Sequence, residues 1–173
     1  MAYHALSSDE TTDLSDAQVN DLDRRISVIM PVYNGAEFIP LSLPPLIDMM
    51  HRGEILEVIV VDDGSTDGSK QMAETIGAKV LSSGGRLGPG GARNQAANTA
   101  LGDILWFVDA DVVVHSDAAR SLGIGFDVDQ VVAVFGSYDS KPPARNFFSQ
   151  YKNLVHHYYH NRARDEAHTF WSG

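Results

Sequence analysis

The chain has 173 residues, of which 43% are hydrophobic, and 23 acidic against 13 basic side chains give it a net charge of −10. This composition predicts one soluble globular domain and disfavours binding to duplex nucleic acid, which needs clustered Lys and Arg. The absence of Cys excludes disulfides, thiolate metal sites and cysteine nucleophiles, and no apolar run approaches the roughly 20 residues of a membrane-spanning helix.

The first 24 residues are polar and rich in Asp, Ser and Thr, which predicts a disordered extension over 1–24. They contain no basic stretch followed by an apolar core, so they do not resemble a secretory signal. We therefore expect a cytoplasmic protein, and we leave membrane association of a longer native chain open.

From Ile26 onwards, short apolar runs alternate with stretches of helical spacing or turn residues. The runs are ISVIMPVY, EVIVVDD, AKVLSS, DILWFVDAD and VVAVFGSY. This alternation predicts an α/β fold, a three-layer sandwich with a mainly parallel central sheet. Residues 55–61 and 104–108 are almost wholly apolar, which is typical of strands buried on both faces. The functional site should lie at the carboxyl ends of these strands.

Helices are predicted between the runs. Ser65, Thr66 or Asp67 would cap one that ends at Gly77. Others are expected at 37–50, kinked or restarted at Pro44 and Pro45, at 91–101, and at 146–164.

Two strand ends carry side chains suited to a nucleotide. PVYNG leaves Tyr33 at the rim, where its ring would face a base, although plain turn chemistry explains the segment equally well. VVDDGSTD places Asp62 and Asp63 together, and capping does not account for adjacent acids at the edge of a core. A carboxylate at such a strand end accepts hydrogen bonds from a base imide or from ribose hydroxyls.

The segment LWFVDAD ends a further strand in Asp109 and Asp111. Side chains at i and i+2 of a strand share one face, so the two carboxylates would offer hard oxygen ligands side by side. Such a pair suits Mg²⁺ or Mn²⁺, with waters and phosphate oxygens completing the shell.

A glycine-rich stretch, GGRLGPGGARN, opens the helix that contains Arg93. Backbone N–H groups there could face an anion, with Arg93 as a positive fork, although a plain flexible loop is also compatible. The stretch lacks the Walker ending and follows the third strand, so it is also a poor dinucleotide fingerprint.

The run HHYYH places His156 and His160 four residues apart on a predicted helix. We favour an amphipathic helix over a zinc site, because no third ligand and no HExxH pattern accompany them. Lys152, Arg162 and Arg164 form a basic edge that could meet an anionic acceptor or a lipid surface.

Taken in order, PVYNG, VVDDGSTDGS, the Gly-rich stretch into ARN, and DAD resemble the signature of family 2 nucleotide-sugar glycosyltransferases of GT-A fold. The resemblance covers about residues 26–114, and the closing FWSG is similar to the F-W-x-G stretch near the acceptor side. It implies that Pro31, Tyr33 and Asp63, with help from Asp62 and Arg93, bind the nucleotide, and that Asp109 and Asp111 bind the metal-diphosphate.

The resemblance further implies an inverting transfer of a sugar to an acceptor hydroxyl, the acceptor being a glycan, a lipid or a small molecule. We favour a UDP-sugar donor, because a compact aromatic and carboxylate pocket suits a pyrimidine whose N3–H donates to Asp63. Family members continue beyond F-W-x-G into an acceptor subdomain that supplies an acidic base. We therefore expect residues 25–173 to be the donor-binding part of a longer transferase, with the base beyond Gly173 rather than at Asp165 or Glu166.

Two alternatives remain at this stage. A non-catalytic module that binds nucleotide-sugars would carry the same pocket without releasing sugar. A nucleotidyltransferase would also use a D-x-D metal site, but it should carry a Gly-rich, basic triphosphate loop where this chain has PVYNG.

Overall fold

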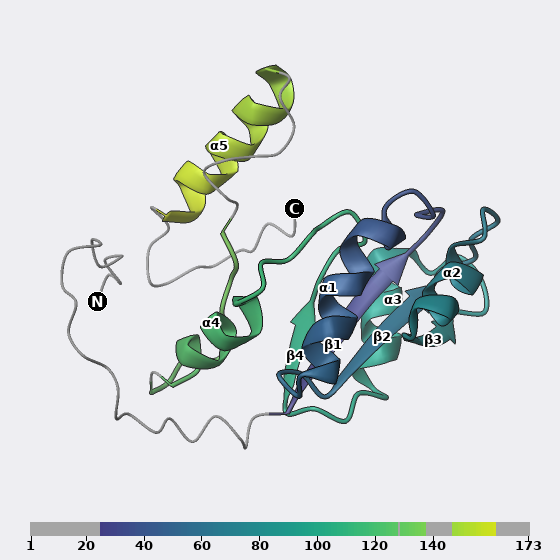
Figure 1. Cartoon of the computed structure of the whole chain (residues 1–173), viewed down its shortest axis with the longest axis horizontal. Coiled ribbons are helices and arrows are strands. Elements are labelled where there is room, and N and C mark those ends of the chain that lie inside the picture. Colours follow the sequence, from purple (N-terminus) through teal and green to yellow (C-terminus); the bar gives the residue numbers. More distant parts are fainter. Residues whose placement is uncertain (1–24, 128, 138–146, 162–173) are drawn as a thin grey trace. The chain divides into compact units, whose positions relative to one another are not determined.

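A computed structural model of the protein describes residues 25–127, 129–137 and 147–161 (Figure 1). One compact unit lies within residues 25–132 and contains the sheet, and the other contains residues 133–137 and 147–161. The extension predicted over residues 1–24 lies outside the described residues.

The sheet unit alternates strands and helices along the chain, as the sequence predicts. Its elements are β1 (Ile26–Val32), α1 (Ile39–His51), β2 (Glu57–Asp62), α2 (Ser69–Ile76), β3 (Lys79–Ser82), α3 (Gly88–Ala97), β4 (Ile104–Phe107) and α4 (Ala118–Gly125). The other unit contains α5 (Phe147–Asn161), within the helix predicted at 146–164.

All four strands run parallel, in the order β3-β2-β1-β4. In the register of β1, Val28 pairs with Val58 of β2 on one side and with Trp106 of β4 on the other. Every residue of β2 is buried, and in β1 only Pro31 is partly exposed. The apolar runs become the two central strands because both of their faces meet apolar layers.

Side chains on the two faces of the sheet belong to two separate apolar clusters. Val28 and Met30 point into a cluster shared with α1, α2 and α4, whereas Ile29 packs against Ala92 and Ala96 of α3. Figure 1 shows α1 in front of the sheet and α3 behind it. The predicted three-layer arrangement around a parallel sheet is thereby confirmed.

Two sequence expectations about single elements need correction. Helix α1 continues through Pro44 and Pro45 and does not restart there. Its buried face, including Leu43 and Leu46, holds the helix on the sheet despite the missing N–H groups. The run VVAVFGSY forms no strand over residues 131–137, where Val132 is 92% exposed.

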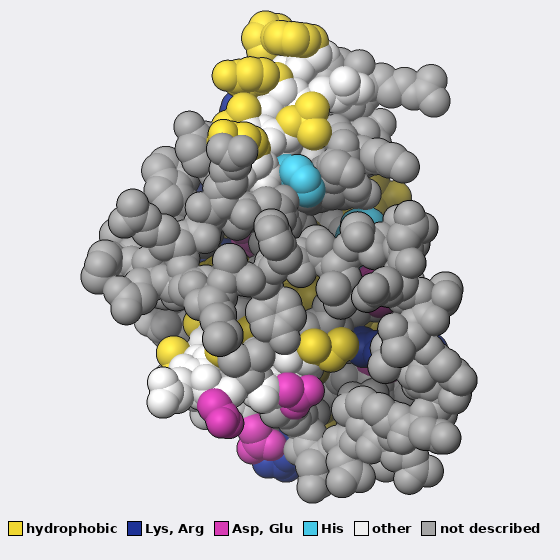
Figure 2. Space-filling view, turned by 90° about the vertical axis from the view of Figure 1, so that its left-hand side faces the viewer, with side chains coloured by type: hydrophobic (Ala, Val, Ile, Leu, Met, Phe, Trp, Pro, Cys, Tyr) yellow, Lys and Arg dark blue, Asp and Glu magenta, His cyan; other side chains and the backbone are white. Residues whose placement is uncertain are grey.

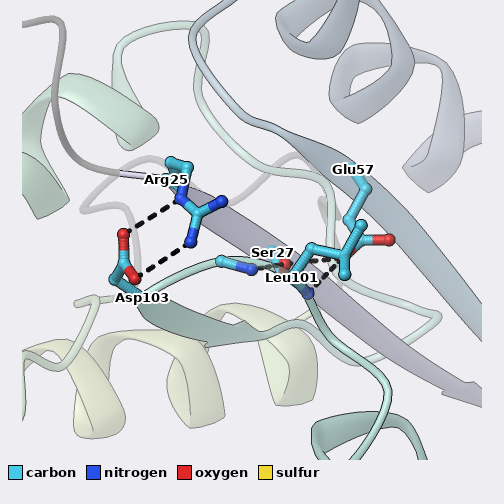
Figure 3. Close-up of polar contacts among 6 residues, drawn as sticks. Arg25, Ser27, Glu57, Leu101 and Asp103 are labelled. Carbon is cyan, nitrogen blue, oxygen red and sulfur yellow. Dashed lines mark hydrogen bonds and ion pairs between the residues drawn. The ribbon is translucent and has the colours of Figure 1, made fainter.

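A buried carboxylate ties the amino ends of β1 and β2 to the loop before β4 (Figure 3). Glu57 Oε1 accepts hydrogen bonds from Ser27 Oγ at 2.8 Å and from the Leu101 N–H at 2.7 Å, while Lys79 Nζ lies 3.0 Å from Oε2. Burial raises the pKa of Glu57, but the hydrogen bonds that it accepts outweigh burial and hold that pKa below its ordinary value. The carboxylate therefore stays charged and fastens three segments together.

Gly102 continues this loop against β1. Its N–H donates to Ser27 Oγ at 2.9 Å, and the next residue, Asp103, forms an exposed ion pair with Arg25 at 3.2 Å (Figure 3). A Cβ on Gly102 would lie 2.5 Å from the Arg25 carbonyl oxygen and 2.6 Å from the Ser27 nitrogen. Only glycine fits this close approach between two backbones.

Helix α5 carries exposed aromatic side chains. The rings of Phe147 and Tyr151 stack with centroids 6.0 Å apart and an interplanar angle of 17°. Figure 2 shows hydrophobic side chains of this helix at the top of the view. The side chains of His156 and His160, as well as Arg162 and Arg164, lie outside the described part of the chain. Within the described ranges, no helix has the length and apolarity to cross a membrane.

Candidate active site at the carboxyl ends of the strands

The strand order reverses direction at β1, and such a reversal marks the usual place for a ligand in an open parallel sheet. The chain proceeds outward from β1 to β2 and β3, then crosses through α3 to β4 on the other side of β1. In open parallel sheets, ligands bind beyond the carboxyl ends of the strands where such a reversal occurs. Of the predicted site residues, Pro31 and Asp62 lie in the last two positions of β1 and β2, and Tyr33, Asp63, Asp109 and Asp111 follow β1, β2 and β4, so all six lie at this edge, while Arg93 lies in α3.

A small hollow of about 100 Å³ opens at this edge. Three of the predicted nucleotide-binding residues, Pro31, Tyr33 and Asp63, line it, and the other lining residues are Val32, Arg86, Gly88 and Pro89. The guanidinium carbon of Arg86 sits 3.6 Å from the centroid of the Tyr33 ring, and that ring is 42% exposed. This cation–π contact places a positive charge on the aromatic wall of the hollow.

Asp63 is almost fully buried, with 3% of its surface exposed. Its Oδ1 and Oδ2 accept hydrogen bonds from the N–H groups of Leu87 and Gly88, each at 2.8 Å. Burial raises the pKa of Asp63, but these bonds, a side-chain hydrogen bond from Ser83 and the nearby charge of Arg86 outweigh burial, so the pKa falls below its ordinary value. A charged Asp63 thus holds the start of α3 and the Gly-rich stretch against the hollow.

Asp62 has a different environment from its neighbour. It is also buried, its Oδ1 accepts a hydrogen bond from the Ser65 N–H at 3.2 Å, and it is not among the residues that line the hollow. Asp62 thus stabilises the turn after β2 by accepting this hydrogen bond. Its predicted contact with a nucleotide stays a prediction.

Side chains after β2 bind the loop after β1. Helix α2 begins after Gly68, which has a φ of 89°, so Gly68 holds the cap position instead of Ser65, Thr66 or Asp67. Of the three predicted residues, Asp67 still serves the helix start, because its Oδ1 accepts the N–H of Ser69, the first residue of α2, at 3.0 Å. The links across the two loops run from Asn34 N to Ser65 Oγ (3.0 Å), from Gly35 N to Ser69 Oγ (2.9 Å), from Ala36 N to Asp67 Oδ2 (2.9 Å) and from Thr66 N to Asn34 Oδ1 (2.8 Å). These hydrogen bonds hold the two loops that carry Tyr33 and Asp63 against each other.

The remaining predicted residues meet after β4. Arg93 reaches from α3 and donates from Nη2 to Asp109 Oδ1, forming an ion pair. Strand β4 ends at Phe107, and the Val112 N–H donates to the Asp109 carbonyl at 3.0 Å, so Asp109 and Asp111 lie in a turn. The argument that a strand would place them on one face does not hold, although the turn still keeps both carboxylates at this edge.

The chemistry of this donor set suits a cation that arrives with further ligands. Carboxylates such as those of Asp109 and Asp111 are hard oxygen donors, which Mg²⁺ and Mn²⁺ prefer. Among the residues with described positions, no group of three or more His, Asp or Glu could hold a metal ion. The set therefore fits a metal-diphosphate better than a metal ion alone.

Arg86 is a site residue that the sequence analysis did not single out. It lies inside the Gly-rich stretch, whose anion-binding role was assigned to Arg93 and to backbone N–H groups. A cationic residue flanked by glycines near an expected aromatic wall is a signal that could have indicated it. Residues 162–173, with Asp165, Glu166 and the FWSG stretch, lie outside the described residues.

The family comparison decides what kind of protein carries this site. The sequence profile described as glycosyl transferase family 2 matches residues 27–172. The chain belongs to glycosyl transferase family 2. The resemblance inferred from the motifs is thereby confirmed, and the match disfavours a nucleotidyltransferase.

Curated relatives of this family 2 chain include two bacterial enzymes. It is 28% identical to glycosyltransferase GlyA of Streptococcus pneumoniae over 153 residues, which are 86% of this chain and 21% of GlyA. It is 32% identical over 108 residues to the poly(ribitol-phosphate) beta-N-acetylglucosaminyltransferase TarS of Staphylococcus aureus, covering 60% of this chain and 19% of TarS. The chain thus spans about a fifth of the length of each relative.

Solved structures of the family share the fold. The crystal structure of S. aureus TarS in complex with UDP-GlcNAc aligns with a TM-score of 0.54 and 33% identity, over 60% of this chain and 31% of that one. Glucosyl-3-phosphoglycerate synthase from Mycobacterium tuberculosis, in complex with Mn²⁺, UDP and glucosyl-3-phosphoglycerate, aligns with a TM-score of 0.51 and 30% identity, over 60% and 40%. These GT-A neighbours confirm the predicted fold type.

Proposed function

We propose that this family 2 chain supplies the donor-binding part of a metal-dependent glycosyltransferase that moves a sugar from a UDP-sugar to an acceptor hydroxyl with inversion. The observation that carries the proposal is the hollow lined by Tyr33, Asp63 and Arg86, at the same sheet edge as the Arg93–Asp109 ion pair. The solved relatives bound to UDP-GlcNAc and to UDP with Mn²⁺ support the same donor class.

The hollow offers an aromatic face and an acceptor for a pyrimidine base. The carboxylate of Asp63 accepts two backbone N–H groups and a side-chain hydrogen bond from Ser83, which leaves one of its four lone-pair sites to accept the uracil N3–H. Arg86 covers one face of Tyr33, so a base that stacks on this face must take the place of the guanidinium. Stacking on this face would therefore require Arg86 to rearrange and would leave Asp63 in place.

The diphosphate would lie toward the turn after β4. Asp109 and Asp111 would hold the cation, which when bound neutralises charge on the leaving diphosphate. Arg93 supplies a further positive charge beside it, and a guanidinium is suited to phosphate oxygens. In the reaction, the acceptor oxygen forms a bond to the anomeric carbon as the bond from that carbon to the diphosphate oxygen breaks, and the hydroxyl proton passes to a base.

Calorimetric titration of UDP tests the proposal directly. UDP should bind in the presence of Mn²⁺ and not in EDTA, because the diphosphate adds negative charge to a site that already holds two carboxylates. Asp111→Ala should abolish the metal-dependent part, whereas Asp48→Ala, which removes an exposed carboxylate on α1, should not. Equal UDP affinity with Mn²⁺ and with EDTA would remove the metal from the proposal.

A panel of nucleotides tests the donor. In thermal-shift measurements with Mn²⁺, UDP should stabilise the chain most, with dUDP and dTDP weaker because both lack the 2′-hydroxyl. A larger shift with GDP than with UDP would overturn the choice of donor. Intact UDP-sugar binding without sugar release by the full-length protein would instead favour a non-catalytic binding module. The cytoplasmic location and a membrane contact of a longer chain stay predictions.

A further inference from the structure

The ion pair between Arg93 and Asp109 joins two residues that the proposed function assigns to different ligands. Arg93 is expected at the diphosphate and Asp109 at the cation, yet in the structure they bind each other. Their side chains are only 20% and 28% exposed. Partial shielding from water makes their attraction stronger than that of an ordinary surface pair, because the effective dielectric constant is lower.

This pairing weakens the site for a cation alone. Two carboxylates and one guanidinium leave a local net charge of −1, and the carboxylate of Asp109 already has a cationic partner. A divalent ion that binds Asp109 must displace Arg93 or tolerate its charge at close range. Over the part of the chain that the structure describes, no third acidic or His ligand is grouped with the pair to compensate.

A nucleoside diphosphate would provide ligands for the metal ion and also a new partner for Arg93. Its oxygens complete the coordination shell of Mg²⁺ or Mn²⁺, which are usually held by one or two carboxylates plus phosphate. The same oxygens accept a guanidinium fork at least as well as a carboxylate does. Arg93 can therefore exchange Asp109 for phosphate, and Asp109 then becomes free for the cation.

We propose that Arg93 competes with the metal ion for Asp109 and thereby makes cation binding depend on the diphosphate. This inference rests on the proposed function and adds the order of events to it: the cation enters with the nucleotide rather than before it. By thermodynamic linkage, the factor by which UDP raises the affinity for Mn²⁺ equals the factor by which Mn²⁺ raises the affinity for UDP. Arg93 is thus a positioning residue that couples the two ligands.

Electron paramagnetic resonance of free Mn²⁺ measures this coupling without reference to catalysis. In the wild type, Mn²⁺ alone should bind weakly, and saturating UDP should raise its affinity by roughly 10- to 100-fold, within the usual range of coupling between sites. Arg93→Met should tighten binding of Mn²⁺ alone by about tenfold, the effect of removing a free-energy difference of about 1.4 kcal/mol. In the same variant, the factor by which UDP raises the affinity for Mn²⁺ should decrease by about the same amount.

Two further variants separate the local pairing from other effects. Arg93→Lys keeps the positive charge and should leave Mn²⁺ alone weakly bound. Arg120→Met removes an exposed arginine of α4 and changes the net charge equally, so it should leave the affinity for Mn²⁺ unchanged. A tightening in Arg120→Met as large as in Arg93→Met would overturn the proposal, because it would show an effect of total charge.

The outcomes also distinguish this inference from the proposed function. If the wild type binds Mn²⁺–UDP but Arg93→Met does not tighten binding of Mn²⁺ alone, Arg93 only braces the fold and the inference is overturned. If the wild type binds no UDP with Mn²⁺, both the proposed function and the inference are overturned.

Should Arg93→Met fail to fold, arginine side-chain NMR of the wild type provides the second test, with Mg²⁺ as the diamagnetic probe. The Arg93 Nε signal should move with Mg²⁺ and UDP together. A shift with Mg²⁺ alone as large as the shift with both would overturn the inference.

Discussion

Substitution of Gly102 by Ala probes the close approach between β1 and the loop before β4. The added Cβ would lie 2.5 Å from the Arg25 carbonyl oxygen, 2.6 Å from the Ser27 nitrogen and 2.7 Å from Ser27 Oγ. Two of these atoms are backbone atoms, one in β1 and one in the residue before it, and they cannot rotate away. Overpacking of this kind costs about 1–3 kcal/mol, and each hydrogen bond lost as the loop moves adds about 0.5–1.5 kcal/mol.

We expect Gly102→Ala to lower the free energy of unfolding by about 3 kcal/mol, a large part of the roughly 5–15 kcal/mol of a typical domain. At about 2–4 °C per kcal/mol for a chain of this size, the melting temperature should fall by roughly 6–12 °C. Circular dichroism during heating, with urea unfolding at 25 °C, would measure both quantities.

Gly123→Ala is a matched control for this substitution. Gly123 lies inside α4 with no atom within 4 Å of an added Cβ. Replacing a helical glycine in open space should stabilise by about 0.5–1 kcal/mol. A melting temperature of Gly102→Ala equal to that of the wild type would refute the reasoning, since it would mean that the loop can leave β1 without cost.

Three further substitutions test separate parts of the fold and the site. The pKa of Glu57 is lower in the folded state, so its contribution to stability is present above its ordinary pKa of about 4.3 and is lost as the pH falls through the folded value. Glu57→Gln should therefore reduce the fall of the melting temperature between pH 7 and pH 3. The same dependence of melting temperature on pH in variant and wild type would contradict this role. Tyr33→Ala should weaken UDP binding by about 1–3 kcal/mol, whereas Tyr33→Phe should retain it. Equal dissociation constants of Tyr33→Ala and the wild type would show that Tyr33 only shapes the turn after β1. Asp63→Asn places an amide donor against the Leu87 or Gly88 N–H, so binding of UDP should fall more than binding of GDP in calorimetry; an equal fall would show that Asp63 does not contact the base.

The sequence predicted the sheet and the edge that carries the site because both depend on local patterns. Buried parallel strands appear as continuous apolar runs, and the side chains that follow β1, β2 and β4 are necessarily brought to one edge. The run VVAVFGSY shows the limit of this reasoning. Its β-branched residues favour a strand, but a strand also needs a partner edge, and sequence alone does not reveal whether one is available.

The site contacts that were missed all join segments distant in sequence. Arg86 reaches Tyr33 across 53 positions of the chain, and Asp67 binds the loop after β1 in addition to the first residue of its own helix. Local propensity favours a cap for an acid before a helix. Asp67 meets this preference with Oδ1, which accepts the Ser69 N–H, while its Oδ2 accepts the Ala36 N–H of the loop after β1, a partner that the local pattern does not indicate.

The position of β1 has a consequence for the synthesis of the chain. β1 is made first, yet one of its edges pairs with β4, whose residues 104–107 follow more than 70 positions later. Until those residues leave the ribosome, a strand with fully buried Val28, Ile29 and Met30 has one edge without its partner. Such an edge readily pairs with other chains. Nascent chains stalled before Ile104 should therefore depend on chaperones, whereas chains that have completed β4 should not.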